Sequence, residues 1–324
     1  MTIQEFAQLC GVTATTVSRV FTSPEKVKET TRKRILQIAE EQGYRPNRAA
    51  SAAFNGKTRM IGVMMMSEGN SYFACIANGM QDELFRNEYT PVLLNMHWQD
   101  SLTVIRRLID FRVAGIIMVD PRRGLLPEEQ REVERLDIPY MFFDDAPRKN
   151  FPHDWVSTDD ESGGTLLANH LLKLGHRDIG VISSPFCTTR VDAFCRTARK
   201  ANARLRLFPW ETFSELFRNP ADLPTAVFAC TDSLAFACQN IILSMGLSIP
   251  GDISLAGYAD LDFAQYVHPG LTTVRQDGNA VGKCAAQLML NRLKDPSLPI
   301  RHELLPVELI VRNSTGAPKT KKNR

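Results

Sequence analysis

The stretch from residue 2 to residue 22, TIQEFAQLCGVTATTVSRVFT, constrains this chain most, because it reads as two short helices joined by a tight turn. Thr2 and Glu5 stand at the spacing at which a hydroxyl and a carboxylate cap a helix start reciprocally. Gly11 can end that helix, since glycine adopts positive φ without steric cost, and Thr13 is suited to cap the next one. The predicted apolar faces consist of Ile3, Phe6, Ala7 and Cys10 in the first helix and Val17, Val20 and Phe21 in the second.

The second of these helices has a small, polar outer face. Small side chains let a backbone approach closely, and an arginine can contact N7 and O6 of guanine with two hydrogen bonds. Such a helix suits the DNA major groove. A capped helical hairpin with merely solvated side chains would give the same pattern, so both interpretations fit this stretch alone. The outward positions are Ala14, Thr15, Thr16, Ser18 and Arg19.

Three sequence blocks favour the DNA-binding interpretation. They are Thr16-Val17-Ser18-Arg19-Val20, Glu29-Thr30-Thr31-Arg32 and Gly43-Tyr44-Arg45-Pro46-Asn47, and together they closely resemble the headpiece of the lactose/purine repressor (LacI) family. The resemblance holds in order and spacing across residues 2–62. It implies a bacterial transcription regulator, cytoplasmic and nucleoid-associated, that binds a pseudo-palindromic operator as a homodimer.

The charge distribution agrees with a nucleic-acid partner at the N-terminus. The formal net charge is only +3, but residues 1–59 hold ten Lys or Arg against five Asp or Glu. Positive charge gathered in a small unit suits salt-sensitive contacts with phosphates. The last nine residues add four more basic side chains, which we expect to belong to a solvated, disordered end.

Catalytic and metal signals do not stand out. The seven cysteines are scattered, and neither CxxC nor HExxH spacing occurs, which argues for reduced thiols and against a zinc site. No nucleophile–base pair or phosphate loop is recognisable. The sequence also shows neither a signal-peptide pattern nor a run of transmembrane length. We therefore expect no enzyme, no metal, no cofactor and no membrane partner.

A third helix and a hinge complete the N-terminal region. The helix is expected at about residues 29–42, with Ile35, Ile38 and Ala39 buried, and Tyr44 is expected to pack beneath it. The Ala-rich stretch that follows is about two turns long, and a helix this short is marginal in water by itself. It could order on DNA beside its dimer mate, or it could be a plain linker.

The resemblance places this hinge helix in the minor groove, where the family wedges a Leu between base pairs. The corresponding residue here is Ala53, which cannot unstack a base step, and Phe54 follows it. Either Phe54 acts as the wedge or the operator is bent less. The residues expected to contact DNA are Thr2, Thr13, Ala14, Thr15, Thr16, Ser18, Arg19, Thr22, Asn47, Arg48, Ala53 and Phe54.

From Met60 onward, apolar stretches alternate with amphipathic helices, which is typical of an α/β protein with parallel sheets. Ten strands fit two doubly wound parallel-sheet subdomains better than one sheet. The family resemblance continues in this region, for example in Gly175-His176-Arg177 and Gly257-Tyr258, and it implies a periplasmic-binding-protein type of fold with crossings near residues 157, 275 and 300. The expected strands are 61–66, 91–94, 115–119, 140–143, 155–157, 179–182, 226–230, 254–258, 271–274 and 304–310.

The chain therefore divides into five parts. We expect a headpiece at residues 1–46, a hinge at 47–59, an N-subdomain at about 60–157 and 276–299, a C-subdomain at about 158–275 and 300–315, and a basic tail at 316–324.

In parallel sheets, ligands bind beyond the carboxyl ends of the strands. Arg190 stands where the family has its effector-contacting Arg. Asp232 and Asp260 could equally cap the helices that follow them, and Trp210 could belong to a core helix with Leu216 and Phe217. The candidates for an effector site are Tyr72, Phe73, Asp144, Arg190, Trp210, Thr231, Asp232 and Asp260.

Three functions fit these patterns. The leading one is a homodimeric repressor whose operator affinity responds to a small effector, such as a sugar or a sugar derivative. A protein corepressor is the alternative, because Ala259 replaces an Asp that many family members have, and the segment between residues 182 and 225 is shorter than usual in the family. A cytosolic solute-binding protein with an unrelated helical N-terminus is the third.

Overall fold

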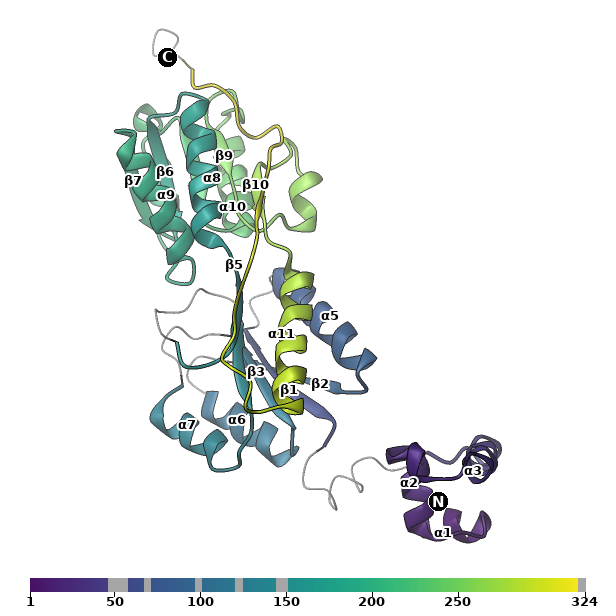
Figure 1. Ribbon diagram of the computed structural model, residues 1–324. Coiled ribbons are helices and arrows are strands. Elements are labelled where there is room, and N and C mark those ends of the chain that lie inside the picture. The colour runs from purple at the N-terminus through teal and green to yellow at the C-terminus, as the bar shows by residue number, and fades with distance from the viewer. Residues whose placement is uncertain (46–57, 67–70, 97–100, 120–124, 144–150, 320–324) are drawn as a thin grey trace.

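The computed structural model describes residues 1–45, 58–66, 71–96, 101–119, 125–143 and 151–319 (Figure 1). The helices are α1 (Ile3–Leu9), α2 (Ala14–Thr22), α3 (Glu29–Glu41), α5 (Ser71–Arg86), α6 (Ser101–Asp110), α7 (Pro127–Glu134), α8 (Asp160–Lys173), α9 (Thr188–Lys200), α10 (Asp232–Ser244) and α11 (Gly278–Lys294). The short 3-10 helices are η1 (Pro24–Lys26), η2 (Phe213–Phe217), η3 (Pro220–Asp222) and η4 (Asp262–Gln265). The strands are β1 (Met60–Met66), β2 (Thr90–Met96), β3 (Gly115–Val119), β4 (Tyr140–Phe143), β5 (Trp155–Thr158), β6 (Asp178–Ser183), β7 (Arg204–Pro209), β8 (Ala226–Ala229), β9 (Ser254–Ala256), β10 (Thr273–Arg275), β11 (His302–Leu305) and β12 (Glu308–Ile310).

The headpiece consists of α1, α2 and α3 around a small core of its own. The capping box of α1 forms as predicted, because the Glu5 amide donates to Thr2 and the Thr2 amide donates to the Glu5 carboxylate. Tyr44 stacks on Phe6 with ring centroids 3.8 Å apart, so its expected packing role is confirmed. Ile3 is 37% exposed and does not join the core that its spacing predicted.

The N-subdomain is a six-stranded parallel sheet in the order β11-β5-β4-β3-β1-β2. Helices α5 and α11 cover one face, and α6 and α7 cover the other (Figure 1). Both faces of its central strand β3 are therefore covered, and every residue of β3 is buried. This burial explains why the strand reads as an unbroken apolar run.

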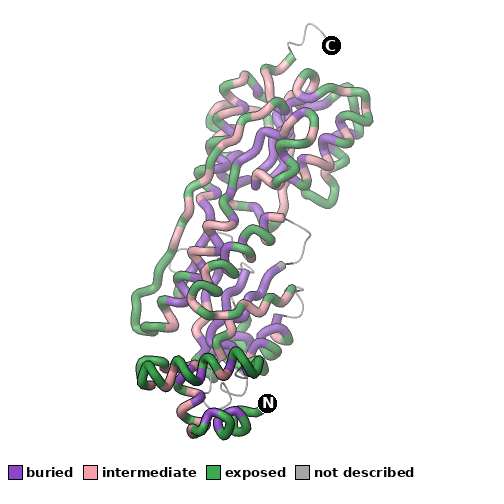
Figure 2. The backbone as a smooth tube through the Cα atoms, turned by 90° about the vertical axis from the view of Figure 1, so that its right-hand side faces the viewer, coloured by how far each residue is buried: buried purple, intermediate pink, exposed green. Residues whose placement is uncertain are grey.

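The C-subdomain is a four-stranded parallel sheet in the order β7-β6-β8-β9, with core clusters on both of its faces. An antiparallel pair, β10 and β12, lies beside it. Figure 2 shows buried backbone concentrated along the strands of both subdomains, with exposed residues on the outer helices. The predicted α/β architecture of two parallel sheets is confirmed.

The chain crosses between the subdomains three times. The first two crossings follow β5 and β10, close to the predicted positions 157 and 275. The third was predicted near residue 300, but β11 still pairs with β5 in the N-subdomain, so the crossing lies between Leu305 and Glu308. The expected strand at 304–310 is consequently two strands in two different sheets. Residues 300–305 belong to the N-subdomain, which corrects the expected boundary.

Two glycines allow α5 and α11 to pack closely. A Cβ atom on Gly282 would lie 2.0 Å from the carbonyl oxygen of Ile76, and one on Gly79 would lie 2.1 Å from that of Asn279. No real side chain tolerates such a distance to backbone. The two helices therefore meet backbone to backbone, which rigidly joins an element from early in the chain to one from late in it.

Candidate DNA interface and effector site

Helix α2 turns its apolar side inward and its polar side outward. Val17 and Val20 are buried in the headpiece core, whereas Thr15 and Arg19 are exposed. Ala14, Thr16 and Ser18 are partly exposed between them. Among the described residues, no hydrogen bond or ion pair holds the Arg19 guanidinium. The outward face is thus formed by small side chains with one long basic side chain.

The turn before α2 is held by hydrogen bonds that use some of the predicted contact residues. The Thr16 amide donates to the Thr13 hydroxyl oxygen at 3.2 Å, and the two hydroxyls lie 3.0 Å apart. Thr13 is therefore the N-cap, as predicted. At the other end of α2, the Thr22 hydroxyl donates to the Ser18 carbonyl at 2.9 Å, so its proton is directed along the helix.

Helix α3 supports this turn through an arginine. Arg34 donates from Nη2 to the carbonyl oxygen of Cys10 at 3.1 Å, at the C-terminus of α1. This contact joins α3 to the C-terminus of α1, just before the turn that leads into α2. The hinge residues Asn47, Arg48, Ala53 and Phe54 and the effector candidate Asp144 lie outside the described residues.

Arg190 lies in a buried polar cluster at the carboxyl ends of the C-subdomain strands. Its Nε donates to Asp160 Oδ2 at 2.8 Å, its Nη2 lies 2.7 Å from the same oxygen, and its Nη1 donates to the carbonyl oxygen of Cys230 at 3.2 Å. The guanidinium also lies over the Tyr258 ring, 4.0 Å from its centroid. The family resemblance marks Arg190 as an effector contact, and in this structure its guanidinium binds a carboxylate of its own chain.

Asp160 connects this cluster to both of the first two crossings. Its Oδ1 accepts hydrogen bonds from Thr158 Oγ1 at 3.0 Å, from Tyr258 Oη at 3.1 Å and from Gln276 Nε2 at 3.2 Å. Gln276 also donates to Thr158 Oγ1 at 2.7 Å. Because Thr158 ends β5 and Gln276 follows β10, these bonds tie the two crossing segments together.

Burial, followed by the charge of Asp160, raises the pKa of Tyr258 well above its ordinary value, so the phenol stays a hydrogen-bond donor. Tyr72, from the N-subdomain helix α5, lies close enough to contribute to that rise. Tyr72 is buried, and its ring centroid lies 5.8 Å from that of Phe73. Tyr72 on α5 and Arg190 on α9 are both buried, so these two predicted effector residues come from different subdomains.

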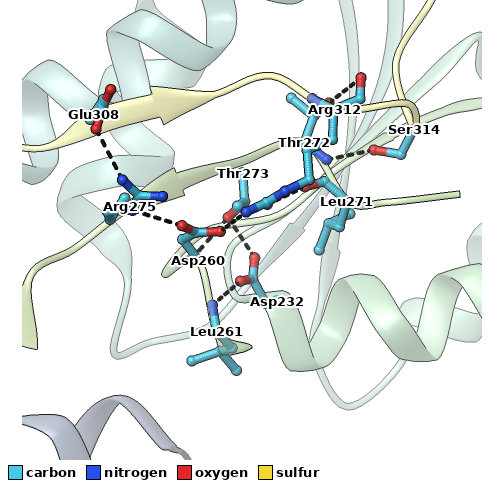
Figure 3. Close-up of polar contacts among 10 residues, drawn as sticks. All are labelled: Asp232, Asp260, Leu261, Leu271, Thr272, Thr273, Arg275, Glu308, Arg312 and Ser314. Carbon is cyan, nitrogen blue, oxygen red and sulfur yellow. Dashed lines mark hydrogen bonds and ion pairs between the residues drawn. The ribbon is translucent and has the colours of Figure 1, made fainter. Parts of the chain in front are cut away.

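Asp260 is clamped between two arginines (Figure 3). Arg275 Nε donates to its Oδ2 at 2.8 Å, and Arg312 Nη2 donates to its Oδ1 at 2.6 Å. Its backbone is in the left-handed region, at φ +54, after Ala259 at φ +131. Asp260 caps no helix, and both its carboxylate oxygens bind residues of this chain.

Asp232 is completely buried. Its Oδ1 accepts from Thr273 Oγ1 at 2.6 Å and its Oδ2 from the Leu261 amide at 2.8 Å (Figure 3). Burial raises the pKa of Asp232 to about 6. The cap of α10 is instead Thr231, which accepts from the Leu234 amide at 3.3 Å. The capping alternative for Asp232 is therefore wrong, because Asp232 is already the first residue of the helix.

Trp210 directly follows β7 and is 43% exposed. Its amide donates to the Ser183 carbonyl at 2.8 Å, at the carboxyl end of the neighbouring strand. Leu216 and Phe217 are buried as the core-helix interpretation required. That interpretation is wrong for Trp210, which stands at the strand-end edge where ligands of parallel sheets bind.

Sequence reasoning missed Asp160, Tyr258 and Gln276 as members of the polar cluster. The residues of this cluster come from four separate parts of the chain, so no short sequence motif contains them. One signal was available, since Asp160 follows a predicted strand as Thr231 and Asp260 do. Within the described ranges, no group of three His, Cys, Asp or Glu side chains could hold a metal ion. None of the helices in those ranges is long and apolar enough to span a membrane.

Comparison with known proteins agrees with this architecture for the headpiece and for both subdomains. Residues 2–47 match the model described as bacterial regulatory proteins of the lacI family, residues 58–202 match periplasmic binding proteins and the sugar binding domain of the LacI family, and residues 168–315 match a periplasmic binding protein-like domain. The HTH-type transcriptional repressor PurR of Vibrio vulnificus (strain CMCP6) is 31% identical over 331 residues, which cover 97% of this chain and 98% of the relative. The chain belongs to the LacI family. It is a DNA-binding transcriptional repressor of that family.

Solved structures of LacI-family regulators have the same fold. The Lac repressor dimer bound to operator and the anti-inducer ONPF aligns with a TM-score of 0.83 at 25% identity, covering 98% of this chain and 99% of that one. A LacI-family regulator from Enterococcus faecium with bound ribose aligns with a TM-score of 0.71 at 29% identity, covering 81% of this chain and all of that one. The predicted family and fold are confirmed.

Proposed function

We propose that the outer face of α2 reads base edges in the major groove of a pseudo-palindromic operator. The observation that carries the proposal is the exposure of Thr15 and Arg19 on a helix whose other side is locked into the headpiece core. Arg19 would contact guanine, and Thr15 a neighbouring base or phosphate. The capped first turns of α1 and α2 would place Thr2 and Thr13 near phosphates.

The protein acts as a homodimer in this proposal, with one headpiece on each half of the operator. Support comes from the Lac repressor, which is a dimer on its operator. It also comes from η4 in the C-subdomain, where Phe263 is 69% exposed and Tyr266, directly after it, is 75% exposed. Aromatic side chains this exposed are typical of a surface that a partner covers.

An effector that binds between the subdomains would modulate operator affinity. Tyr72 and Phe73 would supply rings from one side, and Arg190, Trp210 and Thr231 would supply polar and stacking groups from the other. Paired donors and acceptors beside aromatic rings suit a sugar or nucleoside, which presents hydroxyls next to an apolar face. The ribose in the Enterococcus faecium regulator supports this chemical class.

The polar cluster offers a route from the effector to the headpieces. A ligand that binds Arg190 competes with Asp160, and Asp160 also holds Thr158 and Gln276 on the two crossing segments. Exchange of these bonds would change the angle between the subdomains and hence the spacing of the two headpieces. The subdomains would thus have two arrangements, one with and one without the Arg190–Asp160 bonds. The effector can shift the equilibrium between them only by as much as its affinities for the two arrangements differ.

A protein corepressor is the second candidate. Ala259 offers no carboxylate to a ligand, and both oxygens of the adjacent Asp260 are bound to arginines. Few hydrogen-bond acceptors in this region are therefore left for a small ligand. Such a regulator would respond to a protein that binds the outer surface of the subdomains.

Selection from a pooled library of double-stranded DNA by the full-length protein tests the proposal. We expect a two-fold related consensus, binding that weakens steeply with salt, and an R19A variant that loses about 1–3 kcal/mol with relaxed preference at one base. K33A is the matched control, because Lys33 is exposed on α3 and paired with Glu29. Unchanged affinity and preference in R19A would contradict the proposed reading by α2. Repeating the selection with ribose, cellobiose and nucleosides separates the two modes of regulation.

A further inference from the structure

Strand β7 forms an open edge of the C-subdomain sheet. Of the strands in the described part of the chain, only β6 pairs with it, and β7 lies at the outer rim of the subdomain (Figure 1). The Arg204 amide donates to the Arg177 carbonyl at 2.7 Å, and the Trp210 amide, just past β7, again donates to β6. Backbone groups of successive residues in a strand face opposite sides, so the even-numbered residues of β7 bond to β6. The amides and carbonyls of Leu205 and Leu207 therefore point away from the sheet.

The outward positions of β7 carry neither proline nor charge. Proteins commonly protect an edge strand with proline or with charged side chains. Here both residues with outward backbone groups are leucines, and the Leu207 side chain is 47% exposed. Arg204 and Pro209 stand at the two ends of the strand, and the Pro209 carbonyl already accepts from the Thr212 amide at 3.0 Å. The free part of the edge is therefore short and apolar, with donors and acceptors available to another strand.

Helix α9 lies above this edge and contacts both β6 and β7. Its neighbour on the other side is α8, where Gly164 packs against Arg190 and Ala193. Asp192 and Arg199 lie about two helical turns apart and are turned away from α8. Both side chains are exposed, both line a shallow hollow on α9, and neither has an ion pair within the described ranges. The edge side of α9 thus carries a negative charge at one end and a positive charge at the other.

We propose that two copies of the chain pair through β7 about a two-fold axis, so that their C-subdomain sheets become continuous. A two-fold axis makes the two β7 strands antiparallel. When the axis passes at Arg206, Leu205 of each copy stands opposite Leu207 of the other, and each such pair exchanges two backbone hydrogen bonds. The two Arg206 side chains approach the axis, but Asp178 and Asp222 already neutralise each of them.

The same axis brings the two α9 helices side by side. Because α9 contacts both β6 and β7, the helix lies about one strand spacing from the two-fold axis. Strands are spaced at about 4.8 Å, so the two helices would lie about 10 Å apart, which is a normal packing distance for helices. The second helix runs in the opposite direction, so Asp192 of each copy faces Arg199 of the other. A two-fold contact requires such a self-complementary surface, and a foreign partner does not.

This contact is separate from the proposed homodimer. The exposed aromatic residues of that homodimer, Phe263 and Tyr266, belong to the stretch after β9, at the opposite edge of the sheet. Both contacts can therefore form at once, and each homodimer keeps a free β7 edge on each of its chains. We expect homodimers to join weakly into tetramers and larger even multiples. The size of these assemblies rests on the proposed homodimer, whereas the pairing of β7 with itself does not.

Sedimentation of the full-length protein at rising concentration tests the pairing. The contact is small, so we expect a dissociation constant of about 10–100 µM, measured over about 1–300 µM. L207P should weaken the association about tenfold, because proline removes an outward amide that the contact uses. An edge strand tolerates proline where the amide faces solvent, and unchanged circular dichroism and operator affinity would show that the variant folds. Wild-type protein that stays one species over this range, or L207P that associates as the wild type does, would overturn the pairing.

A charge exchange on α9 tests the two-fold geometry without altering the strand. D192R and R199D should each weaken the association about fivefold, since each places like charges across the axis. The double variant D192R/R199D restores opposite charges and should associate as the wild type does. A double variant that associates no better than either single variant would contradict the two-fold arrangement.

The F263S/Y266S variant separates the two contacts. With the homodimer weakened, single chains should still pair at high concentration, and adding L207P should abolish that pairing. Loss of all association in F263S/Y266S alone would count against the β7 contact. A homodimer of unchanged strength in F263S/Y266S would contradict only the proposed homodimer surface.

Discussion

At the scale of single residues, the most unusual backbone lies at Ala259 and Asp260. Both have positive φ, at +131 and +54, in a region that costs about 1–3 kcal/mol for residues other than glycine. Neighbouring contacts hold this strained backbone in place. The Ala259 amide donates to the Val274 carbonyl at 2.8 Å, and the Asp260 carboxylate binds Arg275 and Arg312. The strain lies next to the polar cluster proposed to sense effector.

Replacing Ala259 by glycine should therefore stabilise the protein. We expect A259G to raise the free energy of unfolding by about 1 kcal/mol, because glycine adopts this φ without steric cost. Chemical denaturation measures it. A256G in β9 is the matched control and should lower stability, since Ala256 is buried in a regular strand. A decrease in A259G comparable to that in A256G would show that the Ala259 methyl group matters more than its φ.

His176 makes stability depend on pH. The ring is buried, and it bonds to Thr225 Oγ1 at 3.0 Å, Ser254 Oγ at 3.1 Å and the Gly316 carbonyl at 2.8 Å. Burial holds the pKa of His176 below its ordinary value of 6.5, so the unfolded chain takes up the proton first. The stability present above about pH 6.5 is consequently lost as the pH falls below that value.

We expect the free energy of unfolding to decrease from pH 7 to pH 5, and to decrease less in H176N. Denaturant titrations at each pH measure both slopes. H302N, which replaces a histidine on the exposed edge strand β11, is the matched control. Equal slopes for the wild type and H176N would contradict this origin of the pH dependence.

At the scale of elements, the close contact of α5 with α11 permits a sharp test. G282A places a methyl group against the Ile76 carbonyl and should lower the free energy of unfolding by about 1–3 kcal/mol, as overpacking does. Thermal or denaturant unfolding measures the loss. Q287A, at an exposed position of the same helix, should be neutral or slightly stabilising, because alanine has the higher helix propensity. No loss in G282A would mean that the two helices can move apart freely.

The elements also show what the sequence could and could not predict. Helix α2 was predictable because its cap, its apolar stripe and its outer face are all local. Strand β7 was missed because arginines alternate with its leucines, and only in three dimensions does Asp178 on the neighbouring strand bind Arg206. The third crossing was misplaced because one apolar stretch supplies two strands to different sheets.

The effector site was the least predictable part for the same reason. Arg190 was recognised through family resemblance, but its partner Asp160 and the links to Tyr258 and Gln276 depend on contacts between distant segments. Asp232 and Asp260 follow strands as ligand-binding residues do. Their carboxylates are nevertheless used inside the C-subdomain, and strand position alone does not distinguish these roles.

At the scale of the whole molecule, the proposed homodimer makes operator binding depend on assembly. Phe263 and Tyr266 are so exposed that replacing them should leave the fold unchanged, while a partner that covers them would lose aromatic contacts. We expect F263S/Y266S to weaken the dimer at least tenfold, measured by sedimentation, and to reduce operator affinity in parallel.

L207S is the control for this prediction. Leu207 is 47% exposed on β7, at the edge of the C-subdomain sheet opposite β9, which precedes η4. A dimer that weakens equally in L207S and F263S/Y266S would indicate a general loss of solubility. An unweakened F263S/Y266S dimer would place the interface elsewhere.

The three crossings also determine the order in which the headpiece and the two subdomains can finish folding during synthesis of the protein. The N-subdomain sheet is incomplete without β11, and the antiparallel pair of the C-subdomain is incomplete without β12 (Figure 1). Neither subdomain can therefore finish folding until the last part of the chain has left the ribosome. The headpiece draws only on residues made at the very beginning. A nascent or prematurely terminated chain thus carries a complete headpiece without the finished subdomains that, in the proposed homodimer, would pair it with a second one.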